Sequence, residues 1–290
     1  MQTPLVITAT PTLMKSDQTL DLAATTEHLA WLKEQGVNAV FAAGTTGEFP
    51  ALSDDERLQV LEATLGVFSA DQVFFHVGAP SAYQAVELTK RAVQQGATKL
   101  AAVTPYYQPA PEPEVVDYYR QLVEAAGSAQ VYAYLFEART GTSSRPEILA
   151  ELAALGVAGV KISGESDESV AAYLAARPEG FAVYSGNDVS FGWLASAGGD
   201  GIVSGVSSVY PEPFIALREA LAADDDAAAK GSQHRIERAV AAVRAGSLTH
   251  LKAGVSARGF SAGPVRSAVS PAPREDVEHI AALVGELASV

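Results

Sequence analysis

Short apolar runs alternate with amphipathic segments along most of this chain. Each apolar run has the length of a buried strand, and the segments between most of them have helical spacing. The strand-like runs cover residues 5–11, 37–44, 72–79, 99–105, 130–136, 156–163, 181–188 and 201–208. The clearest helical segments cover residues 22–36, 53–68, 81–96, 113–127, 146–155 and 168–177.

Local signals mark the ends of several predicted helices. The spacing from Ser53 to Glu56 and from Ser81 to Gln84 is typical of capping boxes, which begin helices. Glycines that follow predicted helix ends favour termination there, because glycine readily adopts the left-handed conformation. These glycines are Gly36, Gly96 and Gly127.

Eight strand–helix units in a chain of 290 residues predict an α/β fold of the (β/α)8 barrel (TIM barrel) type. The remaining pattern is helical, over residues 211–228, 236–245, 251–259 and 275–289. We therefore expect a barrel over residues 1–225 and a C-terminal helical extension over 226–290, packed on the barrel. A doubly wound sheet would favour a Gly-x-Gly-x-x-Gly turn after the first strand, but no glycine stands at residues 10–13.

Composition narrows the function classes. The net charge of −14 argues against nucleic-acid binding, which needs a basic face. The absence of cysteine excludes disulfides and thiolate nucleophiles. The first residues lack the pattern of a signal peptide, and no apolar run is long enough to span a bilayer. We expect a soluble, cytoplasmic protein without nucleic-acid or membrane partners.

Lys161 is the residue most suggestive of chemistry. It lies within an apolar, strand-like run, whereas the other six lysines fall in loops, on polar helix faces or at strand starts. A lysine in an apolar strand loses hydration, which disfavours its charged form, and a neutral amine can attack a ketone to form a Schiff base. The alternative is a lysine at a strand end that extends its charge into solvent.

Active sites of such barrels form at the carboxyl ends of the strands. After the second strand, residues 44–48 (Gly-Thr-Thr-Gly-Glu) form a tight turn whose backbone N–H groups suit a carboxylate, although an ordinary turn fits as well. Tyr107 follows the fourth strand and suits either packing or proton transfer. Tyr132 and Tyr134 share one face of the fifth strand. Arg139, in the next loop, suits either a bound carboxylate or a surface ion pair.

Small residues follow the seventh and eighth strands, at 185–188 and 203–208, and leave space in the barrel mouth. Phosphate often binds at these loops in sugar-phosphate barrels.

The five histidines show no metal-ligand spacing, so no metal site is expected. We expect His76 to be a core histidine, and His28, His234 and His279 to lie on polar helix faces.

Together, Lys161 at the end of the sixth strand, the Gly-Thr-Thr-Gly-Glu turn, Thr104-Pro105-Tyr106-Tyr107, and Tyr134 followed by Arg139 resemble the dihydrodipicolinate synthase / N-acetylneuraminate lyase family. The resemblance covers essentially the whole chain, including the helical tail. It implies a (β/α)8 enzyme that joins or cleaves a pyruvate unit through a lysine imine, with no metal or organic cofactor.

The resemblance also implies catalytic roles. Lys161 would form the Schiff base with the keto carbon, and Tyr134 would be the general acid/base beside it. In the synthases, Thr45 and a Tyr107 from a neighbouring subunit would complete a proton relay with Tyr134. The resemblance therefore implies a homo-oligomer, a tetramer built from dimers.

Further residues would bind substrate. Thr46, with Thr45, would hold the pyruvate carboxylate, and Gly186 and Val203 would line the pocket. Arg139 resembles the arginine that binds the carboxylate of the second substrate in the synthases.

The chain departs from the family pattern in three places. The family usually has Tyr-Asn-x-Pro after the fifth strand, whereas Leu135 and Glu137 stand here in place of its asparagine and proline. Ile162 follows the lysine where a polar or acidic residue is common. We expect Glu137 to place a negative charge near the path of an anionic substrate.

Three function classes remain open. The leading hypothesis is a dihydrodipicolinate synthase-like condensation of pyruvate with aspartate semialdehyde, with aldolases or dehydratases of 2-keto-3-deoxy sugar acids as close rivals. A non-catalytic keto-acid-binding homologue is a hypothesis of another class. A phosphate-binding isomerase barrel is disfavoured by the modest glycine content of the last two strand-end loops.

Overall fold

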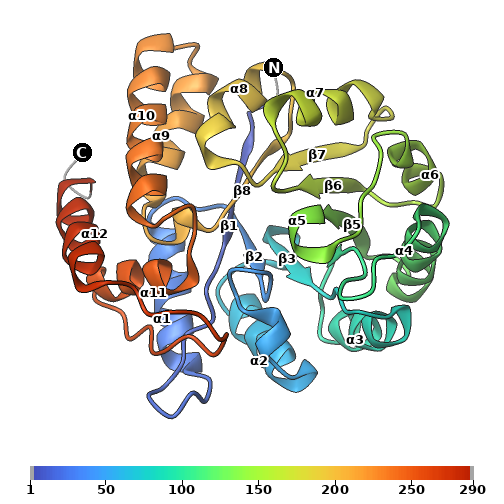
Figure 1. Cartoon of the computed structure of the whole chain (residues 1–290), viewed down its shortest axis with the longest axis horizontal. Coiled ribbons are helices and arrows are strands. Elements are labelled where there is room, and N and C mark those ends of the chain that lie inside the picture. Colours follow the sequence, from blue (N-terminus) through green and yellow to red (C-terminus); the bar gives the residue numbers. More distant parts are fainter. Residues whose placement is uncertain (1–2, 288–290) are drawn as a thin grey trace.

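A closed barrel of eight parallel strands, joined in sequence order, forms the centre of the computed structural model, which describes residues 3–287 (Figure 1). This confirms the predicted (β/α)8 fold. The strands are β1 Leu5–Ala9, β2 Ala39–Ala42, β3 Val73–His76, β4 Lys99–Val103, β5 Gln130–Leu135, β6 Gly159–Ile162, β7 Ala182–Ser185 and β8 Gly201–Ser204.

Helices surround the barrel and continue into a C-terminal helical region (Figure 1, orange to red). The barrel helices are α1 Leu22–Glu34, α2 Asp54–Leu65, α3 Ala82–Gln94, α4 Glu112–Ala126, α5 Glu137–Thr140, α6 Ile148–Ala154, α7 Asp167–Ala176, α8 Phe191–Ser196 and α9 Pro211–Ala222. The C-terminal helices are α10 Asp226–Ala242, α11 Leu248–Ala257 and α12 Arg274–Leu287. Short 3-10 turns are η1 Phe49–Ala51, η2 Ala70–Gln72, η3 Asp188–Ser190 and η4 Val206–Ser208. The predicted helix end at Ser289 lies outside the described residues.

Alternation along each strand sorts side chains between two cores. Tyr132 and Tyr134 of β5 belong to the cluster inside the barrel. Val160 and Ile162 of β6 belong to the cluster between the barrel and its helices. Lys161, between them in sequence, therefore points into the barrel.

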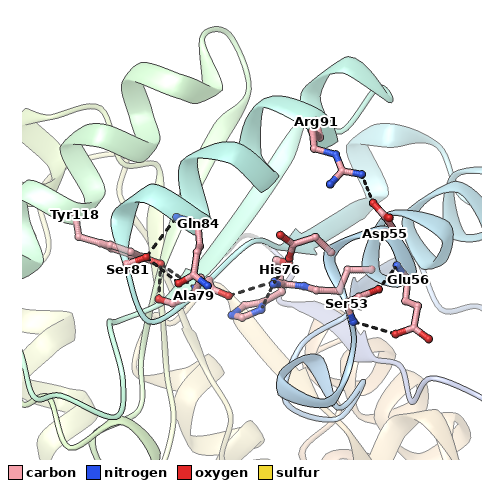
Figure 2. A network of polar contacts seen from close by, with 12 residues as sticks. Ser53, Asp55, Glu56, His76, Ala79, Ser81, Gln84, Arg91 and Tyr118 are labelled. Carbon is pink, nitrogen blue, oxygen red and sulfur yellow. Dashed lines mark hydrogen bonds and ion pairs between the residues drawn. The ribbon is translucent and has the colours of Figure 1, made fainter.

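The helix-end signals are largely confirmed. Ser53 and Glu56 form a reciprocal capping box at the start of α2 (Figure 2). Ser81 caps α3 by accepting from the Gln84 N–H, but the Gln84 side chain meets the Ser81 hydroxyl at 2.8 Å rather than its backbone N–H. The three predicted terminating glycines all have positive φ.

The predicted bounds of the helices at 211–228 and 236–245 are wrong. The structure ends α9 at Ala222 and runs α10 without a break from Asp226 to Ala242. Asp224 adopts a left-handed φ of 53°, which ends one helix, and the Asp225 side chain accepts from the Ala228 N–H, which begins the next.

Two side chains expected on polar helix faces are buried instead. His28 packs between Trp31 and Phe260, and its Nε2 donates to the Ser208 carbonyl at 2.9 Å. Burial lowers the pKa of His28 to about 4. Lys252 is 4% exposed, so Lys161 is not the only buried lysine. His76 is buried as expected: its Nε2 accepts from the Val103 N–H at 3.1 Å.

No helix within residues 3–287 is long and apolar enough to cross a membrane.

Candidate active site

A cavity of about 410 Å³ opens at the carboxyl ends of the barrel strands. Residues at or just beyond the ends of β1, β2 and β5 to β8 line it, as the barrel rule anticipates. Seven of the eight predicted site residues are among them: Thr45, Thr46, Tyr134, Arg139, Lys161, Gly186 and Val203. Tyr107 is not.

Strand register places Tyr134 directly beside Lys161, because these two residues are partners in the β5–β6 ladder. The Lys161 ammonium lies 4.1 Å from the centre of the Tyr134 ring and 4.9 Å from that of Phe41. Lys161 is 7% exposed, and none of the ion pairs found within residues 3–287 includes it. Aromatic faces thus hold this amine by cation–π contact, without a carboxylate that would fix it as an ion pair.

The Tyr134 hydroxyl belongs to a side chain that lines the cavity. It shares a hydrogen bond of 3.3 Å with the Thr45 hydroxyl. The Tyr134 N–H donates to the hydroxyl of Tyr119 on α4, which donates in turn to the Ala102 carbonyl at 2.8 Å. These contacts fix the tyrosine at the base of the cavity, next to Lys161.

Thr45 and Thr46 of the Gly44–Glu48 turn line the cavity. In the part of the chain that the structure describes, the N–H groups of Thr45 and Thr46 and the Thr46 hydroxyl donate to no other group. A Cβ on Gly205 would lie 2.8 Å from the Thr46 hydroxyl oxygen, so glycine there gives the turn its space. Unpaired N–H groups in a tight turn form a concavity that suits a carboxylate.

Arg139 and Tyr107 occupy the rim. Arg139 is exposed, lines the cavity and lies over the Phe136 ring at 5.9 Å. The ion pairs of residues 3–287 do not include it, so the structure gives no support to the surface ion pair that the sequence left open. Tyr107 is 87% exposed and has a left-handed φ of 75°. Its phenol is exposed to solvent and does not line the cavity of its own chain.

Asp188 is a site residue that sequence reasoning missed. It lines the cavity and is 8% exposed, and its Oδ1 atom has no hydrogen-bond partner in residues 3–287. Burial raises the pKa of Asp188 from 3.8 to about 7, although the Ser204 hydroxyl and the charge of Lys161 oppose the rise. A carboxyl with a pKa near neutrality can either donate or accept a proton. The sequence feature that could have identified Asp188 is its position directly after the seventh strand.

Three more polar side chains that line the cavity near Asp188 were also not predicted as site residues. Ser163 and Glu165 follow β6, and Asn187 precedes Asp188 after β7. Together with Asp188 they give the wall opposite the Thr45–Thr46 turn several hydrogen-bonding groups.

We predict that Asp188→Asn removes a pH-dependent loss of stability. The Asp188 carboxyl ionises near pH 4 in the unfolded chain but near pH 7 in the folded protein. Between these two pH values the free energy of unfolding therefore falls as pH rises. The variant should therefore match the wild type near pH 4 and exceed its free energy of unfolding by up to about 4 kcal/mol above pH 7. Urea denaturation across this range measures the difference. A difference that does not change with pH would contradict the prediction.

The departures from the family pattern lie outside the cavity. Leu135 and Ile162 belong to the core between barrel and helices. Glu137, which we expected near the substrate path, is exposed at the start of α5 and does not itself line the cavity, although Phe136 and Arg139 on either side of it do. Glu165 lines the cavity as well. No group of three or more His, Asp or Glu side chains in residues 3–287 is arranged to hold a metal ion.

Known proteins resemble this chain over its whole length. Residues 3–287 match the dihydrodipicolinate synthetase family. An uncharacterized DapA-like lyase of Halobacterium salinarum is 34% identical over 99% of this chain and 92% of its own. The 4-hydroxy-tetrahydrodipicolinate synthase of Parasynechococcus marenigrum is 32% identical over 92% of this chain and 90% of its own.

Solved structures show the same architecture. A variant of the Sulfolobus solfataricus 2-keto-3-deoxygluconate aldolase superposes with a TM-score of 0.88 and 27% identity, covering 99% of this chain and 97% of the aldolase. Another variant of that aldolase, 26% identical to this chain, was solved as a pyruvate complex. Synthases and sugar-acid aldolases are thus similar to this chain to comparable degrees.

Proposed function

Because this chain belongs to the dihydrodipicolinate synthetase family of class I lyases, we propose that it forms an imine between Lys161 and pyruvate, or the pyruvyl end of a 2-keto acid. The observation that carries this proposal is the buried Lys161 amine beside the Tyr134–Thr45 hydroxyl pair, within one cavity. An amine nucleophile beside a group that can carry a proton is the arrangement that imine chemistry needs.

The chemistry follows from this placement. The substrate carboxylate binds the free N–H groups of Thr45 and Thr46 and the Thr46 hydroxyl, which sets the keto carbon near the Lys161 amine. Attack and loss of water give the imine, with Tyr134 carrying the proton. The protonated imine draws electrons from the adjacent carbon, so a C–C bond to an aldehyde can form or break there.

For the second substrate, the opposite wall favours a hydroxylated tail. Ser163, Glu165, Asn187 and Asp188 offer hydroxyl, carboxyl and amide groups to the cavity. The Glu165 carboxylate repels a second anionic group, and all four side chains can form hydrogen bonds with hydroxyls. We therefore propose aldol cleavage, aldol formation or dehydration of a 2-keto-3-deoxy sugar acid as the reaction the geometry supports best.

A synthase acting on aspartate semialdehyde is the second candidate, and Arg139 favours it. The guanidinium at the rim is exposed and has no carboxylate partner in residues 3–287, so it is free to bind the carboxylate of a second substrate.

A substrate panel distinguishes these candidates. The protein is incubated with pyruvate and a series of aldehydes, aspartate semialdehyde included, and separately with 2-keto-3-deoxy sugar acids alone, and the products are identified. We expect turnover of the sugar acids. Turnover of aspartate semialdehyde alone would establish the synthase instead. Turnover of none, together with binding of pyruvate, would favour a non-catalytic keto-acid-binding protein.

Arg139→Ala tests the synthase candidate. If a second carboxylate binds Arg139, its loss costs about 1.5–3 kcal/mol, or roughly ten- to a hundred-fold in kcat/KM. The effect should fall on the KM of the second substrate and leave imine formation nearly unchanged. Arg145→Ala is the matched control, because Arg145 is exposed nearby but pairs with Glu112 at 2.8 Å. For a neutral, hydroxylated second substrate we expect both variants to resemble the wild type.

We also propose that the active protein is a homo-oligomer, a tetramer built from dimers. The exposed Tyr107 phenol, on a residue with a left-handed φ that does not line the cavity of its own chain, supports a role in the cavity of a neighbouring subunit. Light scattering during turnover is expected to show the oligomer. An active monomer would remove Tyr107 from the proton relay.

A further inference from the structure

A buried ion pair connects the Gly44–Glu48 turn to the C-terminal helical region. The Lys252 ammonium on α11 lies 2.9 Å from Glu48 Oε1. Glu48 is 1% exposed and Lys252 is 4% exposed, and neither lines the cavity. Removing two charges from water is costly, so such a pair persists only with further partners.

Those partners come from the segment that follows α11. The second Glu48 carboxylate oxygen accepts from the Arg266 and Ser267 N–H groups, each at 2.9 Å. The Lys252 ammonium donates to the Pro264 carbonyl at 2.7 Å. A closed network of charges and backbone groups therefore connects the turn after β2 to residues 252–267.

The same segment is anchored on its far side. Arg266 binds Glu56 of α2 through two hydrogen bonds, of 2.6 and 2.8 Å. In Figure 1 the red segment after α11 runs back toward α2, in agreement with this contact. Glu48 therefore contacts a segment that is itself held in place.

The turn needs an external anchor because its backbone is strained. Ala43, which precedes it, and Glu48, at its end, have left-handed φ angles of 51° and 58°. Residues other than glycine persist in this region only where surrounding contacts impose it. Between them lie Thr45 and Thr46, which line the cavity and whose N–H groups donate to no group in residues 3–287.

We propose that Glu48 and Lys252 are positioning residues that hold the Thr45–Thr46 turn in its carboxylate-binding shape. The C-terminal helical region then contributes to pyruvate binding, because it holds the turn that binds the carboxylate. This inference rests on the proposed function, because it assigns the turn to the carboxylate of the keto acid.

Borohydride trapping of pyruvate, followed as a function of pyruvate concentration, tests the inference. In Glu48→Gln and Lys252→Met, the half-maximal pyruvate concentration should rise by roughly tenfold, as expected when charge-assisted contacts to one carboxylate are misaligned. The trapping rate at saturating pyruvate should stay within about threefold, because Lys161 and Tyr134 are unchanged. Glu48→Asp keeps the charge but shortens its reach, and should also weaken pyruvate binding.

Two further variants separate positioning from stability. Glu212→Gln breaks a partly buried ion pair between Glu212 of α9 and Arg258 at the end of α11, at 2.7 Å, that does not touch the turn. It should lower Tm without changing the pyruvate dependence. The double variant Glu48→Gln/Lys252→Met leaves no unpaired buried charge, so its Tm should recover relative to the single variants while pyruvate binding stays weak.

Two results would overturn this inference and leave the proposed function intact. One is a wild-type dependence on pyruvate concentration in the Glu48 and Lys252 variants, and the other is pyruvate binding that recovers together with Tm in the double variant. Absence of any pyruvate adduct on the wild-type protein would overturn the proposed function, and this inference with it.

Discussion

Lys161→Ala is expected to lower turnover by roughly 10⁴-fold or more, because the covalent route through an imine is lost. The fold should remain, since Lys161 has no ion-pair partner in residues 3–287 and its ammonium is costly to bury. Steady-state kinetics on the best substrate of the panel measures the loss, and thermal unfolding checks the fold.

Lys99→Ala is the matched control. Lys99 is a partly buried lysine of the same barrel, with its ammonium 5.0 Å from the centre of the Phe74 ring, but it begins β4 at the opposite end of the strands. Its removal should leave kcat and KM near those of the wild type. Near-full activity in Lys161→Ala would show that the buried amine is structural.

Tyr134→Phe is expected to lower kcat by roughly 10²–10⁴-fold, the usual contribution of a general acid/base. The substitution removes only the hydroxyl that bonds Thr45, while the ring that contacts Lys161 stays in place. Imine trapping should therefore slow but persist. Single-turnover kinetics with pyruvate and borohydride separates the two effects.

Tyr132→Phe provides the comparison for this variant. Tyr132 points into the barrel from the same strand, but its hydroxyl donates to Gln130 and it does not line the cavity. It should retain activity. If the two variants behave alike, Tyr134 acts as a packing residue and the proton relay must be sought elsewhere.

Local pattern was sufficient for the barrel, but it left open whether the Lys161 amine extends into solvent, and the structure resolves this. Alternation with a period of two sends Val160 and Ile162 outward and Lys161 inward. The rule that active sites form at the carboxyl ends of barrel strands then selected the region of Thr45, Tyr134 and Gly186. The contact between Tyr134 and Lys161 depends on register between neighbouring strands, and only the family resemblance suggested it before the structure did.

What local pattern missed depends on contacts between distant parts of the chain. Lys252 looked like a surface residue because its burial depends on Glu48, which is far away in sequence. His28 looked polar because its neighbours in α1 are polar, yet Phe260 covers it. The raised pKa of Asp188 arises from burial in a cavity that only the assembled barrel creates.

Mass spectrometry after reaction with pyruvate and borohydride tests the central claim most directly. We predict one reduced pyruvyl adduct per chain, on a peptide that contains Lys161, and none in Lys161→Ala. Labelling at Lys252 or Lys99, or no adduct on the wild-type protein, would contradict the assignment of Lys161 as the imine-forming residue.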